Sequence, residues 1–346
     1  MSEPVVGWDL GGAHLKAARL DPCGAVECVV QLPCPLWLGI DRLHAALEQA
    51  AALLGPARLH AVTMTGEMVD LFPTRIDGVE RLVTAMRERY PEEELRFYAG
   101  TGGFVGAGEA AGAAKRIASA NWMASGTLVA GARTDAMLVD IGSTTTDLVV
   151  VRGGRIAARG FDDATRLAAG ELVYTGVVRT PVMAMAEQVP FEGVRMPLIA
   201  ENFATAADVH RLTGRLREGA DQYPAADGGE KTAAGSARRL ARMIGHDSGS
   251  RPLTAWSELA AWLAGVQLGR IFDACAGLIG REGLAMDAPV VGAGIGRFLA
   301  EELAARLRRP YVEFGRLLPG IRCDDEGVSD CAPAVAVARL AQVESG

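Results

Sequence analysis

The chain has 346 residues, of which 49% are hydrophobic, so it is long enough to bury two separate cores. Its formal net charge is -7 and it carries no basic stripe, which argues against a nucleic-acid-binding protein. The six cysteines form no Cys-x-x-Cys pair, so we expect reduced thiols in a cytoplasm rather than a zinc site. A polar dipeptide follows Met1, and apolar stretches such as 259–267 are too short to cross a membrane. We therefore expect neither a signal peptide nor a membrane span.

The first half of the chain alternates between short apolar runs and amphipathic segments, a pattern typical of an α/β fold. Its opening run, a glycine pair and a second apolar run predict a β-hairpin over 4–20. The strands expected in this half are 5–10, 15–20, 25–30, 60–65 and 95–98. The helices expected in this half are 40–54, 77–90 and 109–119. Segment 127–130 fits either an edge strand or the end of a helix.

The second half begins with the same three-strand pattern, which indicates an internal repeat. Strands at 138–141 and 146–151 flank a polar turn, and a third strand at 155–158 follows the turn at Gly153 and Gly154. The helices expected after this repeat are 206–212, 236–244, 252–282, 294–307 and 332–342. The strands expected after it are 289–292 and 310–314.

Three details of the second half follow from local signals. Ser236 is the expected N-cap of its helix. The long amphipathic segment 252–282 predicts one helix, either unbroken or interrupted near Gly265 or Gly269. Segment 216–235 is rich in Asp, Gly and Ala and predicts a loop or flap.

Each half contains one polar turn between two apolar strands, and these turns are the expected ligand-binding loops. The first begins at Asp9 and contains two glycines, and the second runs from Asp140 to Asp147 through a glycine and hydroxylated residues. Glycine lets backbone N–H groups approach an anion closely, and hydroxyl groups add further donors. Both turns therefore predict phosphate binding. Taken alone, each aspartate is also typical of a residue that caps its own turn.

The two loops and the glycine turn at 291–296 resemble those of the superfamily that contains acetate and sugar kinases, heat-shock chaperone ATPases and actin. The resemblance implies an α/β fold of two duplicated ribonuclease-H-like domains with a central cleft. The first domain would span 1–136, completed by a closing helix at 331–346. The second would span 137–330, with an insertion at about 160–250. The second loop looks closest to the hydantoinase and oxoprolinase branch.

Four longer strings, at 62–72, 120–122, 170–181 and 200–205, resemble a small family linked to tetrahydromethanopterin-dependent one-carbon metabolism. Its archaeal members act in methanofuran biosynthesis, where they join the phenol of a glutamyl-tyramine to an (aminomethyl)furanmethyl diphosphate and release pyrophosphate. The resemblance implies a cytoplasmic, Mg²⁺-dependent transferase with small-molecule substrates, acting in methanofuran or methylofuran synthesis. It implies no nucleic-acid or membrane partner, and it leaves a homodimer open.

The resemblance also implies roles for individual residues. Asp9 and Asp140 are the expected metal ligands and, with Glu171, the expected catalytic residues. The expected phosphate contacts are Gly11, Gly12, His14, Lys16, Gly142, Ser143, Thr144, Thr145, Gly292 and Gly294. The expected substrate contacts are Glu67, Asn121, Trp122, Tyr174 and Arg179. Glu67 and Glu171 are alternatives for the general base, and a packing side chain is the competing interpretation of Trp122.

Two other classes of function stay open at this point. Ala13 and His14 stand where many sugar kinases have a hydroxylated turn, which weighs against simple γ-phosphoryl transfer. An ATP-dependent kinase or a hydantoinase/oxoprolinase-like ATPase is nevertheless an alternative, and it predicts ATP binding at 292–296. A non-enzymatic, ATP-gated binding protein would need an appended module, for which the chain leaves no room.

Overall fold

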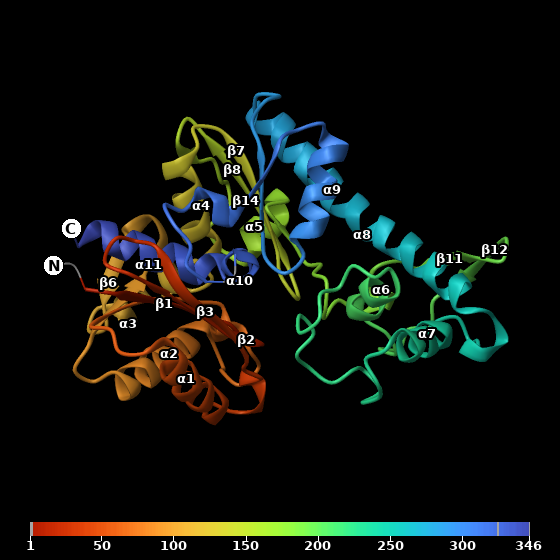
Figure 1. Ribbon diagram of the computed structural model, residues 1–346, viewed down its shortest axis with the longest axis horizontal. Coiled ribbons are helices and arrows are strands. Elements are labelled where there is room, and N and C mark those ends of the chain that lie inside the picture. The colour runs from red at the N-terminus through yellow and green to blue at the C-terminus, as the bar shows by residue number, and fades with distance from the viewer. Residues whose placement is uncertain (1–2, 324, 346) are drawn as a thin grey trace. The chain divides into compact units, whose positions relative to one another are not determined.

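The computed structural model describes residues 3–323 and 325–345 (Figure 1). The contacts within the chain divide it into two compact units. Unit 1 comprises Met1–Leu138, Val149–Ala169 and Val312–Gly346, and unit 2 comprises Val139–Leu148 and Gly170–Tyr311. The domain limits expected from the sequence follow the internal repeat rather than these contacts, and they stay a prediction. The predicted domains include residues 1, 2, 324 and 346, which lie outside the described residues.

Unit 1 is built on a six-stranded sheet with the order β3-β2-β1-β4-β5-β6. β1 pairs antiparallel with its hairpin partner β2 and parallel with β4. All six residues of β1 are buried, as is typical of a central strand covered on both faces. The strands are β1 (Val5–Leu10), β2 (His14–Leu20), β3 (Val26–Pro33), β4 (Leu59–Met64), β5 (Glu94–Tyr98) and β6 (Phe104–Gly106).

Helices cover both faces of this sheet (Figure 1). α1 and α2 share a core with Trp8 and Leu10 of β1, and α11 packs against β1, β2 and β4 from the other face. Gly7 permits this close packing, because a Cβ there would collide with the carbonyl oxygen of Ala334 in α11. The helices of unit 1 are α1 (Asp41–Leu54), α2 (Arg75–Arg89), α3 (Ala110–Ile117), α4 (Asn121–Ala132), α5 (Asp163–Ala169), α10 (Asp325–Asp330) and α11 (Ala332–Glu344). Segment 127–130 lies inside α4, so it is helical and not an edge strand.

The second sheet has the order β10-β8-β7-β13-β14, with β9 paired to β8. β7, β8 and β9 repeat the succession of β1, β2 and β3, which confirms the internal repeat predicted from the sequence. The third strand of this repeat is only two residues long and does not reach residue 158. The strands are β7 (Ala136–Ile141), β8 (Thr146–Arg152), β9 (Arg155–Ile156), β10 (Leu172–Val173), β13 (Val290–Ala293) and β14 (Tyr311–Glu313).

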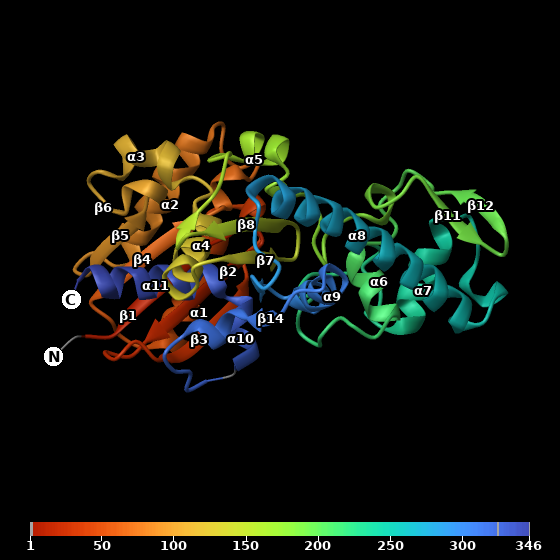
Figure 2. The same ribbon diagram turned by 90° about the horizontal axis from the view of Figure 1, so that it is seen from above.

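The helical part of unit 2 has a small core of its own, which contains Trp256 and Leu263 of α8. Figure 2 shows α6 and α7 beside the N-terminal half of α8, near the two-stranded sheet of β11 and β12. These elements are β11 (Gln188–Phe191), β12 (Val194–Pro197), α6 (Ala206–Leu212), α7 (Ala233–Arg242), α8 (Leu253–Glu282) and α9 (Arg297–Leu307). Short 3₁₀ turns lie at Leu36–Leu38, Gly66–Met68, Gly100–Gly102, Val182–Ala184, Ser248–Ser250 and Phe314–Leu317.

α8 runs unbroken for 30 residues through Gly265 and Gly269. By length and composition it is the one helix of the described residues that is apolar enough to cross a membrane. Ten of its residues are buried within the fold, including Leu259 and Leu263. An apolar stripe buried against α6 and α7 is typical of a core helix, and we interpret α8 in that way.

α7 begins three residues earlier than its predicted start. Thr232, and not Ser236, is the N-cap, and its side chain accepts a hydrogen bond from the backbone N–H of Gly235. Ser236 is fully buried and donates instead to Asp208 Oδ1 at 2.8 Å. The cap prediction was wrong because the hydroxyl group of Ser236 is hydrogen-bonded to a buried carboxylate of another helix, Asp208 of α6.

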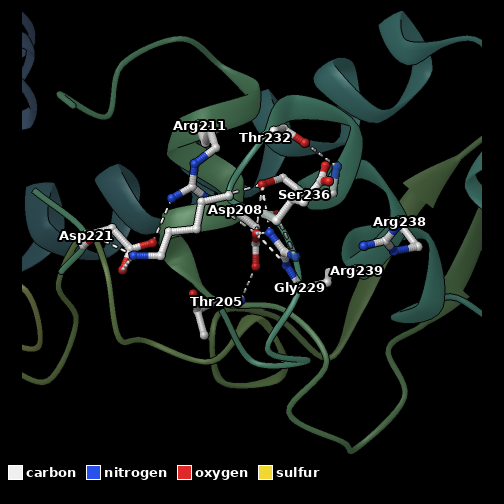
Figure 3. Close-up of polar contacts among 12 residues, drawn as sticks. Thr205, Asp208, Arg211, Asp221, Gly229, Thr232, Ser236, Arg238 and Arg239 are labelled. Carbon is white, nitrogen blue, oxygen red and sulfur yellow. Dashed lines mark hydrogen bonds and ion pairs between the residues drawn. The ribbon is translucent and has the colours of Figure 1, made fainter. Parts of the chain in front are cut away.

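Asp208 of α6 is the centre of a buried ionic network (Figure 3). Arg239 of α7 is completely buried and pairs with Asp208 Oδ1 at 2.7 Å and with Asp227 Oδ1 at 3.0 Å. Arg211 pairs with Asp221 at 2.7 Å, and the Lys231 ammonium donates to the Asp221 carbonyl oxygen at 2.7 Å. The loop before α7 is therefore held to the helices by charged side chains.

We expect Arg239→Met to lower the free energy of unfolding by about 3 kcal/mol, because Asp208 then keeps a buried charge without its closest cation. Arg238→Met is the matched control, since Arg238 is half exposed and lies 3.9 Å from Asp227. The control is expected to cost less than about 1 kcal/mol. Urea denaturation measures both values. Equal losses for the two variants would contradict a structural role of the Asp208 network.

Candidate functional site

The second loop is a four-residue hairpin turn between β7 and β8. It is closed by a hydrogen bond from the backbone N–H of Gly142 to the carbonyl oxygen of Thr145, at 2.9 Å. The hydroxyl oxygens of Ser143 and Thr144 lie 3.4 Å apart, and both side chains are half-buried. A hairpin of this kind presents hydroxyl groups on a fixed backbone, as the sequence predicted.

A second segment of unit 2 supports this loop from behind. The carbonyl oxygen of Gly142 accepts from Val177 N–H at 3.1 Å, and that of Ser143 accepts from Arg179 N–H at 2.8 Å. Gly176 lies so close to the loop that a Cβ on it would overlap the Ser143 carbonyl group. Because these two carbonyl groups bond inward, the half-buried hydroxyl groups are the polar side-chain groups that the loop offers to a ligand.

Buried polar side chains hold this supporting segment in turn. Gln267 of α8 donates through Nε2 to Thr175 Oγ1 and to the Gly176 carbonyl oxygen, each at 2.8 Å. Its Oε1 lies 2.7 Å from Nε2 of His210 in α6. Burial lowers the pKa of His210 to about 4, so the ring is neutral at pH 7 and its Nε2–H donates to Gln267. The chain of contacts runs from α6 through α8 to the second loop.

The glycine turn after β13 also packs on the second loop. The backbone N–H of Gly296 donates to the Ile141 carbonyl oxygen at 2.8 Å. Gly294 has a φ of 78°, and a Cβ on it would collide with the Ile141 carbonyl oxygen and lie 2.5 Å from Asp140 Oδ1. Only glycine satisfies both the left-handed backbone and this close packing. Asp140, the second loop and the glycine turn therefore meet at one end of β7.

The first loop lies in unit 1, between β1 and β2. The backbone N–H of Gly11 donates to the His14 carbonyl oxygen at 3.0 Å and closes the turn. Asp9 is 6% exposed and lies opposite Lys16 in the hairpin register. The Lys16 ammonium donates to the carbonyl oxygen of Asp330 at 2.8 Å, so a phosphate contact by Lys16 stays a prediction. Gly12 lies beside Val69, which follows β4.

The residues of the 170–181 string have different environments. Glu171 is buried and forms an ion pair with Arg281 of α8, so its carboxylate already has a charged partner within the fold. Tyr174 is 59% exposed, and Arg179 is exposed as well. Solvent reaches both of these side chains, and their contact with substrate stays a prediction.

The remaining predicted residues lie in unit 1. Glu67 is buried directly after β4, and burial raises its pKa to about 7, against the lowering effect of a hydrogen bond from Ser119. Asn121 is the first residue of α4, and Trp122 is 2% exposed with the Arg166 guanidinium 4.0 Å from its ring centroid. A cation therefore stacks on Trp122.

Three residues around Glu67 escaped the sequence interpretation. Ser119 bonds to Glu67, and Asp163 and Arg75 act on the same carboxyl group through their charges. Ser119 and Asp163 lie far from Glu67 in the sequence, whereas Arg75 lies near it. No local motif connects these three residues with Glu67. The sequence signals for them were the charge of Arg75 at the start of α2 and the aspartate pair Asp162 and Asp163 at the start of α5.

The two aspartates predicted to bind Mg²⁺ each lie at a glycine-containing loop. Within the described ranges, no group of three or more His, Cys, Asp or Glu side chains gathers as a metal site. Mg²⁺ commonly binds through one or two carboxylates together with phosphate oxygens and water. Asp140 is half-buried beside Gly294, and Asp9 is buried at the first loop. A metal contact by either carboxylate stays a prediction.

Comparisons with known proteins place the chain in a family, and the matched region includes the second loop. Residues 58–316 match the profile of the hydantoinase/oxoprolinase family. Over 241 residues the chain is 29% identical to the (4-{4-[2-(gamma-L-glutamylamino)ethyl]phenoxymethyl}furan-2-yl)methanamine synthase of Methanocaldococcus jannaschii, covering 69% of this chain and 71% of that protein. The synthase of the same name from Methanococcus vannielii is 34% identical over 82 residues, which are 24% of this chain and 36% of that protein.

The fold is also similar to that of a solved enzyme. The nucleotide-free structure of an acetone carboxylase, described as ATP-dependent, superposes with a TM-score of 0.55 and 11% identity. The match covers 96% of this chain and 70% of that one. At this identity the likeness shows the fold alone.

We expect Gly176→Ala to lower the free energy of unfolding by about 1–3 kcal/mol, because its methyl group would push the Ser143 backbone away. Gly277→Ala is the matched control, since Gly277 lies on an exposed part of α8 with no atom within 4 Å of the position that a Cβ would take. The control is expected to gain about 0.5–1 kcal/mol from better helix propensity. Thermal melts compare the two. A neutral Gly176→Ala would mean that the second loop moves freely.

Proposed function

Because the chain belongs to the hydantoinase/oxoprolinase family and its curated relatives are synthases of an aryl ether, we propose that it is an ether-forming transferase. The name of these relatives describes a phenoxymethyl group attached to a furan that carries a methanamine. We propose that this chain joins a phenolic acceptor to an (aminomethyl)furanmethyl diphosphate and releases pyrophosphate. The similarity to the synthase over 69% of the chain is the observation that carries the proposal.

The proposed reaction needs a site that holds a leaving diphosphate. The hydroxyl groups of Ser143, Thr144 and Thr145 are fixed on a loop whose carbonyl groups bond inward, so they suit an anion. We propose that Asp140 of this loop and Asp9 of the first loop hold Mg²⁺, which would neutralise the charge that the diphosphate carries. The glycine turn at 292–296 packs against Ile141 and Tyr311. In this proposal, backbone N–H groups of Gly292 and Gly294 would add phosphate contacts at the end of β7.

The other predicted contacts belong to the same proposal. Gly11, Gly12, His14 and Lys16 of the first loop would contact phosphate oxygens. Tyr174, Arg179, Asn121 and Trp122 would position the acceptor, in which a guanidinium such as that of Arg179 suits a carboxylate. We place the reaction in the synthesis of a methanofuran-type cofactor for tetrahydromethanopterin-linked one-carbon metabolism.

Asp140→Asn is expected to abolish turnover and to leave the thermal melt close to that of the wild type, because the amide keeps the size of the side chain but not its charge. Asp273→Asn, on an exposed face of α8, is the control and is expected to keep full activity. The assay incubates purified protein with both substrates and Mg²⁺ and measures pyrophosphate and the ether product. Wild-type protein that forms neither product would refute the transferase. An active Asp140→Asn would place the metal elsewhere.

Calorimetry separates this proposal from a nucleotide-dependent activity on the same fold. We expect pyrophosphate with Mg²⁺ to bind and chelation of Mg²⁺ to remove most of that binding. Saturable ATP binding with formation of ADP would favour the kinase or ATPase alternative instead.

A further inference from the structure

A buried carboxyl group lies in unit 1, outside both ligand loops. Glu67 belongs to the 3₁₀ turn Gly66–Met68 directly after β4, and only 1% of it is exposed. Its Oε1 accepts a hydrogen bond from Ser119 Oγ at 2.8 Å. Its Oε2 is also buried, and none of the residues in 3–323 and 325–345 bonds to it. A buried carboxyl oxygen without a partner is unusual and marks a place where a further polar group can bind.

The partner of Glu67 is held in a strained position. Ser119 lies between α3 and α4 with a φ of 52°, in the left-handed region that non-glycine residues seldom adopt. This backbone directs its hydroxyl group to Glu67, and the same Oγ lies 3.4 Å from Asp163 Oδ2. Asp163 is ion-paired with Arg75 of α2. Strained residues of this kind concentrate at functional sites.

The charges around Glu67 tune its protonation. Burial raises the pKa of Glu67 to about 7 and dominates over the other influences. The hydrogen bond from Ser119, the residue's own backbone N–H and the positive charge of Arg75 lower this pKa, and the negative charge of Asp163 raises it. A carboxyl group balanced near neutral pH both takes up and releases a proton at little cost, which is what a general base requires.

A partly exposed methionine lies beside this cluster. Met68 is 42% exposed, and its sulfur lies 3.6 Å from Ser119 Oγ and 3.3 Å from a guanidinium nitrogen of Arg75. Methionine changes rotamer easily and packs well against aromatic rings. In the proposal below, a phenolic ring would take the place of the Met68 side chain beside Ser119 and Arg75 and bring its hydroxyl group to Glu67.

We propose that Glu67 is the proton acceptor for the phenolic hydroxyl group of the acceptor, and that Ser119 and Asp163 position it and adjust its basicity. This inference rests on the proposed transferase function. The phenolic O–H bond breaks and its proton passes to Glu67. The phenolate oxygen forms the new C–O bond to the furanylmethyl carbon, and the bond from that carbon to the diphosphate oxygen breaks with its electron pair on the diphosphate. Glu67 then returns the proton to water.

Glu171, the other candidate base, has a different environment. Its carboxylate is paired with Arg281 at 2.5 Å, so it already has a charged partner within the fold. Glu67 has a bonded oxygen and an unbonded one, so it is the better placed of the two to take up a proton.

The pH dependence of kcat/KM tests the proposal. The wild type is expected to lose activity as pH falls through about 7, because protonated Glu67 cannot accept a proton. Glu67→Gln is expected to lower kcat/KM by about 10²–10⁴-fold and to remove this acidic limb. Ser119→Ala removes an influence that lowers the pKa, so the limb should move to higher pH. Asp163→Asn removes one that raises it, so the limb should move to lower pH.

Two matched controls lie on exposed parts of α2. Glu88→Gln and Thr84→Ala remove the same chemical groups far from the cluster and should leave the rate and the limb unchanged. Infrared difference spectra of the wild type and Glu67→Gln across this pH range measure the carboxyl titration directly, without substrate. If Ser119 or Asp163 has only a structural role, its substitution would lower the free energy of unfolding and leave the acidic limb of kcat/KM at the wild-type pH.

The outcomes separate the two proposals. If the wild type forms the ether and Glu67→Gln keeps its rate and its acidic limb, Glu67 is not the base and the transferase stands. If the wild type forms no ether, the transferase falls and the role of Glu67 as its base falls with it. If Glu67→Gln does not fold, the pH profiles of Ser119→Ala and Asp163→Asn test the proposal. An acidic limb of kcat/KM at the wild-type pH in both variants would overturn it.

Discussion

The packing of the 175–179 segment against the second loop is the constraint on which the geometry of unit 2 depends. Hydrogen bonds from Val177 and Arg179 occupy the loop carbonyl groups, and Gly176 allows the two backbones to touch. Since these carbonyl groups are bonded within the fold, the hydroxyl groups of Ser143 and Thr144 are the groups that the loop would offer to the proposed diphosphate. The proposed anion site would thus depend on the packing of neighbouring chain segments rather than on local positive charge.

Unit 1 contains a different kind of site, in which the protein retains unfavourable interactions. Glu67 is buried with one oxygen unbonded, and Ser119 adopts a backbone conformation that costs about 1 kcal/mol or more. Such costs persist only where surrounding packing enforces them. Here Glu67 follows β4, Arg75 begins α2 and Asp163 begins α5. The packing of these three elements elsewhere in unit 1 offsets the unfavourable free energy of the cluster.

Sequence patterns were sufficient for the fold because its signals are local. Apolar strands, amphipathic helices and the repeated hairpin with its aspartate predicted the order of elements and an α/β fold, which is confirmed. The family was inferred separately, from the resemblance of the second loop, and it is confirmed as well. The environment of single side chains was not predictable in this way. Ser236 bonds to a carboxylate 28 residues away, Arg166 covers Trp122, and Asp163 reaches the Glu67 cluster. These pairings depend on tertiary contacts that leave no periodic trace in the sequence.

The continuity of α8 links features that the sequence spaces widely. At 1.5 Å per residue its 30 residues span about 45 Å. Trp256 near one end lies in the small helical core, Gln267 in the middle holds the segment behind the second loop, and Arg281 near the other end pairs with Glu171. Because a helix has a fixed rise per residue, α8 sets the distances between these three contacts in unit 2. Inserting or deleting one residue between Trp256 and Gln267 would rotate one part of α8 by about 100° relative to the other. Trp256 could then not pack in the helical core while Gln267 holds the segment behind the second loop.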